Sequence, residues 1–246
     1  MSVKIWNKTD RGKVRPVNQD YVLTDIYPDD LQAVAVVCDG MGGANAGNIA
    51  SKLAAEHISE RLKAALRGRM NAAYMREVLD SSIREANELV YNASLNDPAC
   101  HGMGTTVVAL LCNGDCGVLA NVGDSRAYLI NDDGISRITR DHSLVEEMLS
   151  RGELTREEAK VYPNRNLITR AVGTETDVKT DLFEIRLYED DFILICTDGL
   201  TNCVDEQEIL YEVKNMDDTD SCCDRLIDIA MQRGAPDNVS VVLLKI

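Results

Sequence analysis

Apolar and polar positions follow two different periods along the chain, and the change of period separates expected helices from expected strands. Two early stretches repeat apolar residues every three or four positions, which is typical of amphipathic helices. They comprise Ile49, Leu53, Ile58, Leu62 and Leu66, and then Met75, Leu79, Ile83, Ala86 and Val90. Asp97-Pro98 is expected to end the second helix, because proline disfavours helical geometry in the residue before it.

Short runs of β-branched and other apolar residues predict strands. These runs cover residues 21–26, 33–38, 105–111, 116–122, 126–130, 181–187, 192–197 and 239–246. Asn113-Gly114 is a strong signal for a tight hairpin between two of them. Asp132-Asp133-Gly134 predicts another turn. Two further helices are expected near residues 206–214 and 221–232, and residues 142–160 form a polar, helix-prone segment.

Strands grouped in hairpins, with helices in separate pairs, favour antiparallel sheets covered by helices. A regular alternation of strand and helix, which would indicate a parallel sheet, is missing. The predicted fold class is therefore α+β in layers. No Gly/Ser/Pro-rich linker interrupts the 246 residues. We therefore expect a single domain over residues 1–246.

Charge and hydropathy exclude some classes of protein. The chain carries 26 basic and 41 acidic residues, a formal net charge of −15. Such a surface repels nucleic acids and anionic membranes, so neither is an expected partner. No run approaches the roughly 18 consecutive apolar residues of a membrane helix. Residues 1–11 lack the apolar core of a signal peptide, and a cytoplasmic location is expected.

Eight cysteines raise the questions of disulfides and of zinc. Zinc sites combine paired Cys-x-x-Cys groups or histidines. Here the nearest approaches are Cys112 with Cys116 and the adjacent Cys222 and Cys223, and the three histidines are scattered. Cys38 and Cys196 end apolar runs, where a free cysteine behaves as a small buried hydrophobe. Reduced thiols in a reducing compartment are the expected state.

Two aspartates follow almost wholly apolar runs, and each precedes a glycine. Asp39-Gly40 comes after residues 33–38, and Asp198-Gly199 after residues 192–197. Asp-Gly is also a common turn pair, and the polar surroundings of Asp133-Gly134 fit that simple interpretation. A carboxylate at the end of a buried strand, however, is costly to desolvate unless a cation or several donors compensate. Function is therefore slightly favoured for Asp39 and Asp198.

Three further acids are expected at strand ends: Asp20, Asp124 and Asp237. Oxygen ligands without a convergent His/Cys set favour magnesium or manganese over zinc. Two such ions about 3.5–4 Å apart can clamp a phosphate and activate water. Arg15, close in sequence to Asp20, is a candidate for bidentate binding of phosphate oxygens.

Seven motifs occur in an order that resembles a known family. They are Gly12-x-x-Arg15-x-x-Asn18-Gln19-Asp20, Val37-Cys38-Asp39-Gly40-Met41-Gly42-Gly43, Gly102-Met103-Gly104-Thr105-Thr106, Asn121-Val122-Gly123-Asp124-Ser125-Arg126-Ala127-Tyr128, Asp141-His142-Ser143, Thr197-Asp198-Gly199-Leu200 and Asp237-Asn238-Val239-Ser240. Together they resemble the metal-dependent serine/threonine protein phosphatases of type 2C, particularly the compact bacterial members. The resemblance spans nearly the whole chain. It implies two packed antiparallel sheets flanked by pairs of helices, with metals at one edge.

The resemblance also implies roles for individual residues. Two manganese or magnesium ions are expected, with a possible weaker third. Asp39 would bridge both ions and Gly40 would offer its backbone carbonyl to one. The other expected metal-site residues are Asp198 and Asp237 in the shell of the second ion, Asp20 holding metal-bound waters, and Asp124 with Asp198 at the third ion. Arg15 matches the position that binds phosphate.

The implied reaction is in-line attack on phosphorus by a metal-bridging hydroxide, without a phosphoenzyme. The absence of a Cys-x5-Arg motif agrees with this. Residues 144–170 correspond to a variable flap beside the site, where Glu146, Glu147, Glu157 and Glu158 are expected to be solvated. The expected substrates are phosphorylated proteins, the expected counterpart is a cognate serine/threonine kinase, and a monomer is expected.

Three positions depart from patterns common in the family. Met41 stands where some animal members have a histidine that protonates the leaving group, so a metal-bound water is our hypothesis for that proton. Ala44 replaces a frequent histidine and Asn48 a frequent glutamate. Asn48 is expected in a first helical turn, where its side chain can satisfy backbone donors.

Two functions are alternatives to an active phosphatase: a catalytically silent phosphoprotein-binding relative, and a two-metal nuclease or nucleotide hydrolase. The net charge and the absence of basic or Gly-rich phosphate-binding runs weigh against the nuclease.

Overall fold

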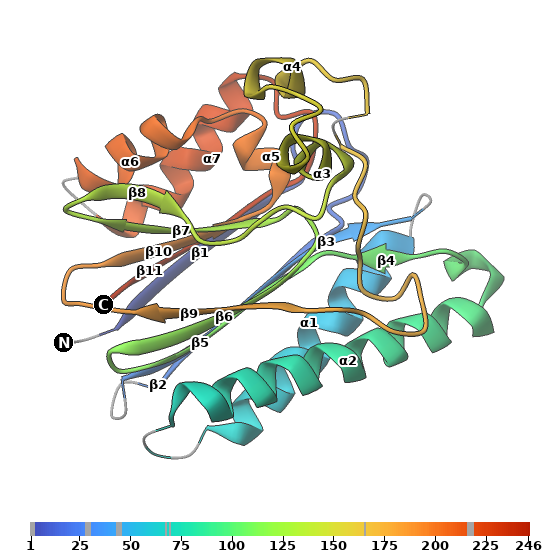
Figure 1. Ribbon diagram of the computed structural model, residues 1–246, viewed down its shortest axis with the longest axis horizontal. Helices are drawn as coiled ribbons and strands as arrows, with labels where there is room; N and C mark the ends of the chain where they lie inside the picture. Colours follow the sequence, from blue (N-terminus) through green and yellow to red (C-terminus); the bar gives the residue numbers. More distant parts are fainter. Residues whose placement is uncertain are drawn as a thin grey trace.

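Two antiparallel sheets pack face to face, and helices cover the outer face of each (Figure 1). The computed structural model describes residues 3–27, 31–42, 46–66, 68, 70–164, 166–215 and 219–246. The layered α+β fold predicted from the sequence is confirmed.

The first sheet has the strand order β1-β11-β10-β7-β8. These strands are β1 (Lys4–Asp10), β7 (Arg126–Asn131), β8 (Gly134–Arg137), β10 (Phe192–Cys196) and β11 (Val239–Lys245). The helical elements over this sheet are α5 (Asp198–Thr201), α6 (Glu206–Lys214), the short 3-10 helix η3 (Thr219–Ser221) and α7 (Cys222–Gln232). In Figure 1 they form the orange and red layer above the sheet.

The second sheet has the order β2-β3-β5-β6-β9, with the short β4 paired to β3. Its strands are β2 (Asp20–Tyr27), β3 (Gln32–Met41), β4 (Gly104–Thr105), β5 (Val107–Asn113), β6 (Cys116–Val122) and β9 (Asp181–Arg186). The long helices α1 (Ala46–Ala65) and α2 (Ala72–Asn96) cover it, followed by the 3-10 helix η2 (Pro98–Cys100).

Burial on both faces explains why the central strands are almost wholly apolar. In β3, Val34, Val36 and Cys38 join the apolar cluster under α1 and α2. The alternate residues Ala33 and Val37 join the cluster between the two sheets. A third cluster lies between the first sheet and α6 and α7. The strand ends that carry polar residues are thereby held against rigid, dry layers.

Most predicted elements occur within one or two residues of the expected positions. Asp97 ends α2 as its C-cap. Asn113 pairs with Cys116, so the hairpin turn consists of the two residues after Asn113. Strand β1 was not predicted, because a mixed polar sequence at a sheet edge gives no apolar alternation.

The expected flap, residues 144–170 and hereafter the flap segment, contains two short helices rather than one helical stretch. These are α3 (Leu144–Ser150) and α4 (Arg156–Lys160). Ser143 caps α3, and Thr155 forms a capping box with Glu158 at the start of α4. The flap segment returns to its own base, where Ser143 and Ile168 form an isolated antiparallel bridge.

The state of the cysteines and the character of the helices were both predicted from the sequence. All eight cysteines are free, as predicted; Cys116 and Cys203 are only partly buried, whereas the others lie in the core. Within the described ranges, no helix combines the length and apolar character required to cross a bilayer.

Candidate functional site

Asp20 and Asp39 lie opposite each other on neighbouring strands of the second sheet. Asp20 is the first residue of β2, and its register partner on β3 is Asp39. The sequence analysis placed Asp39 and Gly40 after their strand, but β3 continues to Met41 because Gly40 and Met41 pair with β4. The apolar part of β3 therefore carries Asp39 directly to the edge of the sheet.

The buried carboxylate of Asp20 connects the two sheets. Its Oδ2 atom accepts hydrogen bonds from Thr197 Oγ1 at 2.9 Å and Ser240 Oγ at 2.7 Å. Thr197 immediately precedes Asp198, and Ser240 lies in β11, three residues after Asp237. The other carboxylate oxygen, Oδ1, is buried and has no hydrogen-bond partner among the described residues. An unpartnered buried acceptor of this kind is a candidate position for a bound ion or an ordered water.

Asp198 and Asp237 belong to adjacent ends of antiparallel strands. Asp198 begins the short helix α5, one residue after the end of β10, whereas the sequence analysis expected no helix there. Gly199 permits this geometry, because a Cβ atom there would lie 1.8 Å from the carbonyl oxygen of Asn238. The Asp-Gly pair is thus required by the close approach of α5 to the residues before β11.

Asn238 holds the loop that carries Arg15 against the site. Its Nδ2 atom donates to the carbonyl oxygens of Arg11 at 2.7 Å and Val17 at 3.0 Å. Its Oδ1 atom accepts the backbone N–H of Gln19 at 2.8 Å. One buried side chain therefore fixes three points of this loop. Arg15, about half exposed, reaches Asp237 with 2.7 Å between Nη2 and Oδ2.

The backbone around Asp39 and Gly40 is densely bonded. Thr106 Oγ1 accepts the N–H of Asp39 at 3.0 Å, and Thr105 Oγ1 donates to its carbonyl oxygen at 2.9 Å. A Cβ atom on Gly40 would lie 2.0 Å from the carbonyl oxygen of Gly47 in α1. The first turn of α1 thus packs directly on Gly40.

Of the positions that depart from the family pattern, Asn48 lies within the described residues and Ala44 does not. Gly43 and Ala44 lie outside the described residues. Asn48 lies inside α1, which begins at Ala46. Its Oδ1 atom is buried without a partner among the described residues. The expectation that Asn48 satisfies backbone donors as a cap is therefore wrong.

The acids raise one another's pKa. Burial raises the pKa of Asp39 well above its ordinary value, and the nearby charges of Asp20, Asp198, Asp124 and Asp237 raise it further. Burial likewise raises the pKa of Asp20 to about 7, in spite of its two hydroxyl donors. The pKa of Asp198 is raised by burial and then by Asp237. Five acids far apart in the sequence thus converge closely enough to repel one another, which is typical of functional sites.

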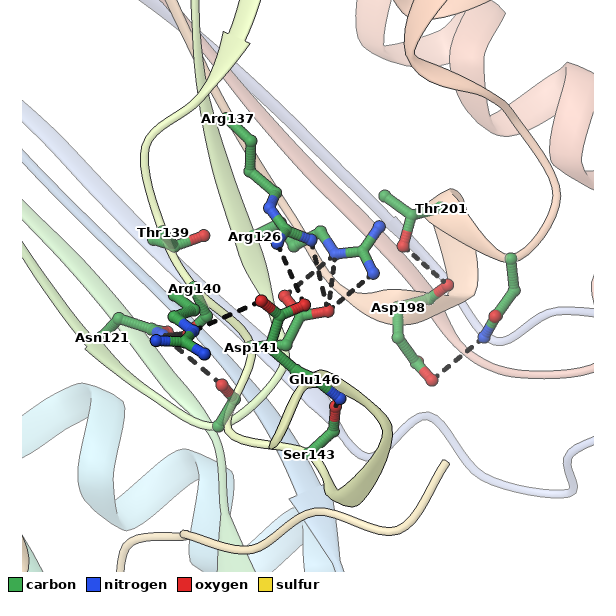
Figure 2. A network of polar contacts seen from close by, with 12 residues as sticks. Asn121, Arg126, Arg137, Thr139, Arg140, Asp141, Ser143, Glu146, Asp198 and Thr201 are labelled. Carbon is green, nitrogen blue, oxygen red and sulfur yellow. Dashed lines mark hydrogen bonds and ion pairs between the residues drawn. The ribbon is translucent and has the colours of Figure 1, made fainter. Parts of the chain in front are cut away.

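Asp124 joins this group from the turn between β6 and β7. Burial raises its pKa to about 7, and the charges of Asp198 and Asp141 add to the effect. Arg126 offsets this effect only in part, because its guanidinium is bound to Asp141, with Nη2 2.6 Å from Oδ2. Figure 2 shows Arg126 and Arg137 converging on Asp141, with Asp198 on the other side of Arg126.

His142 fixes the turn that presents Asp124. Its Nδ1 atom accepts a hydrogen bond from the backbone N–H of Gly123 at 3.0 Å. The backbone N–H of His142 in turn donates to the carbonyl oxygen of Gly123 at 2.9 Å. Its Nε2 atom lies 3.1 Å from Asp181 Oδ2, while Arg170 pairs with the same aspartate. Burial lowers the pKa of His142, which favours the neutral ring that accepts at Nδ1. The sequence analysis did not assign these roles to His142 or Asn238, although both stood in the motifs that it quoted.

A cavity of about 1040 Å³ opens beside these acids. Asp124 and Asp198 line one part of it, and residues of the flap segment line another. Ser143, Glu146 and Arg140 mark this region in Figure 2. In the described part of the chain, no three acidic, histidine or cysteine side chains already meet as a complete set of metal ligands. What converges is a set of oxygen donors with an excess of negative charge.

Comparisons with known proteins agree with this geometry. The sequence model of the family described as Protein phosphatase 2C matches residues 13–237. The chain is 36% identical to the serine/threonine phosphatase stp of Listeria innocua, over 97% of this chain and 94% of the relative. It superposes on the serine/threonine phosphatase Stp1 of Staphylococcus aureus with a TM-score of 0.92 at 35% identity, covering 100% of this chain and 96% of that one. A PstP catalytic domain in complex with two manganese ions matches with a TM-score of 0.86 at 31% identity, over 99% and 98% of the two chains.

Proposed function

The chain belongs to the protein phosphatase 2C family and is a metal-dependent serine/threonine protein phosphatase, and we propose that its reaction takes place where the five carboxylates converge. The observation that carries this proposal is the shared edge of two sheets at which the pKa values of Asp20, Asp39, Asp124 and Asp198 are raised by burial and by neighbouring carboxylates, Asp237 among them. That much buried negative charge is costly without a counter-charge. Divalent cations are the counter-charge that suits the site.

The donor set fits manganese or magnesium. Every candidate ligand is an oxygen, and the unpartnered Oδ1 of Asp20 is a buried acceptor without a compensating donor. We propose that Asp39 and the carbonyl group of Gly40 hold one ion, and that Asp39, Asp198 and Asp237 hold a second. Asp20 would act through water, and Asp124 with Asp198 would serve a weaker third ion. Such ions supply Lewis-acid activation of water and a counter-charge for phosphate oxygens.

Residues of this chain account for the orientation of the phosphate, and they argue against a cysteine nucleophile. Among the described arginines, Arg15 is the one paired with a candidate ligand, Asp237, and its half-exposed guanidinium can turn to phosphate oxygens. No thiol is suited to act as the nucleophile, since burial raises the pKa of both Cys38 and Cys196. We therefore propose in-line attack by water, without a phosphoenzyme. Met41 has no proton to give, so a water in the site protonates the leaving oxygen.

Phosphorylated proteins are the substrates, and the reaction implies a serine/threonine kinase that supplies them. We propose that the protein acts as a monomer, because the site is assembled from residues of one chain. Eight free thiols support a reducing compartment such as the cytoplasm. The flap segment lies beside the site and is proposed to form part of the substrate-binding surface.

The decisive experiment compares two Asp-Gly pairs in the same chain. Asp39→Asn removes a proposed ligand, whereas Asp133→Asn changes an exposed aspartate in the turn between β7 and β8. Turnover of a phosphothreonine peptide is measured with manganese and with magnesium. We expect Asp133→Asn to match the unchanged protein and Asp39→Asn to lose at least about a hundredfold in kcat.

Other outcomes would favour the two alternatives. If the unchanged protein binds the phosphopeptide but turns it over no faster than Asp39→Asn does, the protein is a silent phosphoprotein-binding relative. Cleavage of nucleotides or nucleic acid in preference to phosphopeptides would favour the nuclease or nucleotide hydrolase. Anomalous scattering from crystals soaked in manganese would show how many ions bind.

A further inference from the structure

Four arginines, Arg126, Arg137, Arg140 and Arg156, help to line the cavity of about 1040 Å³ beside the acids. Asp124 and Asp198 lie at one part of its lining, and Arg137, Arg140 and Arg156 lie elsewhere in it. This concentration of arginine is unexpected in a chain of net charge −15. The volume greatly exceeds what a phosphate group needs, so the space beside the acids can also take side chains that flank a phosphorylated residue.

The arginines of the cavity differ in how fully their charge is compensated. Arg126 is saturated by Asp141, which accepts from both its Nε and its Nη2. Arg137 and Arg140 share the carboxylate of Glu146 over longer distances of 3.4 and 3.3 Å, and Arg137 also lies 3.5 Å from Asp141. Glu146 was expected to be solvated, and this pairing corrects that expectation. Arg140 keeps 54% of its side chain exposed.

Arg156 has the greatest capacity to bind a further anion. It begins helix α4 in the flap segment, lines the cavity, is exposed, and forms no ion pair with any described residue. One other carboxylate in the lining, Glu206, belongs to α6 on the side of the first sheet. Among the described arginines that line the cavity, Arg156 is thus the one that presents its guanidinium without a paired acid.

We propose that Arg140 and Arg156 form a subsite for an anionic side chain of the substrate, placed a few residues from the phosphorylated one. The proposal rests on the function proposed above, because Asp124 and Asp198, two of the proposed metal-site residues, place the reaction beside this cavity. An extended chain advances about 3.3–3.6 Å per residue, so side chains two to four positions away reach about 7–14 Å from the phosphate. Guanidinium groups bind carboxylates and phosphates alike, which makes an acidic residue or a second phosphoresidue the expected ligand.

The test uses three phosphothreonine peptides that differ at the flanking positions only. One carries glutamates, one carries a second phosphoserine, and one carries glutamines. We expect the unchanged protein to favour the two anionic peptides in kcat/KM by about three- to tenfold, since partly exposed ion pairs contribute modestly. The preference should fall as salt is raised from 0.05 to about 0.5 M, through screening.

Variants then locate the subsite. Arg156→Gln and Arg140→Gln should each reduce the ratio between anionic and neutral peptides, and Arg156→Glu should bring it below one. The matched control is Arg84→Gln on α2, where the arginine is also exposed but pairs with Asp80. That variant should keep both the ratio and the basal activity.

The outcomes separate this inference from the function on which it rests. If no peptide is turned over, the proposed function fails. If all three peptides are turned over at equal rates, or if Arg156→Gln and Arg140→Gln keep the full preference, the subsite is wrong while the function stands. A preference for the second phosphoserine alone would assign the subsite to doubly phosphorylated segments rather than to acidic ones.

Discussion

Asp20 and Asp39 face each other across β2 and β3, so two acids whose pKa values are both raised occupy one register position. Asp20 in particular is almost fully buried between the sheets. Its carboxylate is therefore a source of instability in the metal-free protein, and the size of that effect depends on pH.

The first prediction concerns this dependence. The pKa of Asp20 is about 7 in the folded protein and about 3.8 in the unfolded chain. The folded state therefore binds the proton more tightly, and the free energy of unfolding falls as pH rises from about 4 to about 7. Without metal, Asp20→Asn should be more stable than the unchanged protein at pH 8, by a few kcal/mol, and the difference should shrink toward pH 4. Urea denaturation in EDTA measures it; a difference that is constant with pH would contradict the prediction.

The second prediction concerns Arg15. Arg15→Lys keeps the charge but loses the planar fork that binds two phosphate oxygens. We expect kcat/KM for a phosphopeptide to fall about ten- to a hundredfold, while the melting temperature changes little because the ion pair with Asp237 is partly exposed. Arg11→Lys is the control, since Arg11 lies in the same loop and, among the described residues, its side chain makes only a long hydrogen bond, at 3.4 Å to the carbonyl oxygen of Pro16. Equal losses in both variants would argue against phosphate binding by Arg15.

The third prediction concerns the support of Asp124. In His142→Leu the N–H of Gly123 loses its acceptor, which should lower the free energy of unfolding by about 1–3 kcal/mol. His142→Asn supplies an oxygen near the position of Nδ1 and should recover part of this loss. We also expect the leucine variant to bind manganese more weakly at the proposed third site, which Asp124 and Asp198 would serve. Titration calorimetry with manganese measures this. Identical behaviour of the two variants would show that the hydrogen bond to Gly123 is unimportant.

The fourth prediction concerns Gly199. In Gly199→Ala the new methyl group would overlap the carbonyl oxygen of Asn238, at 1.8 Å, so α5 must move and carry Asp198 with it. We expect a loss of more than about 2 kcal/mol in stability, together with a large loss of activity. Gly152→Ala is the control: it has a φ of +72° and open space around it, and strain alone should cost about 1 kcal/mol there. Equal effects in thermal unfolding would exclude the clash as the cause.

Much of the fold could be predicted, because burial on one or both faces imposes a clear period on the sequence. The helices α1 and α2 and the strands from β5 to β7 follow directly from it. Strand β1 could not be predicted, since an edge strand alternates weakly and is specified by its partner β11. The lengths of β3 and α5 also depend on contacts with distant residues, through β4 and Asn238.

The candidate site could be predicted as a set of residues but not as an arrangement. A carboxylate at the end of an apolar run is visible in sequence, as Asp39 and Asp198 illustrate. The hydroxyl donors of Asp20, from Thr197 and Ser240, depend on the packing of two sheets and give no local signal. Asn48 shows the limit most clearly, because its residue type suggested a cap and its buried oxygen has no partner.

The position of β11 has a consequence for biosynthesis. It lies between β1 and β10, and it follows every other described strand in sequence. A nascent chain that still lacks β11 has no bridge between β1 and the rest of that sheet. Catalytic competence should therefore arise abruptly, only once β11 has been synthesised and has paired with β1 and β10.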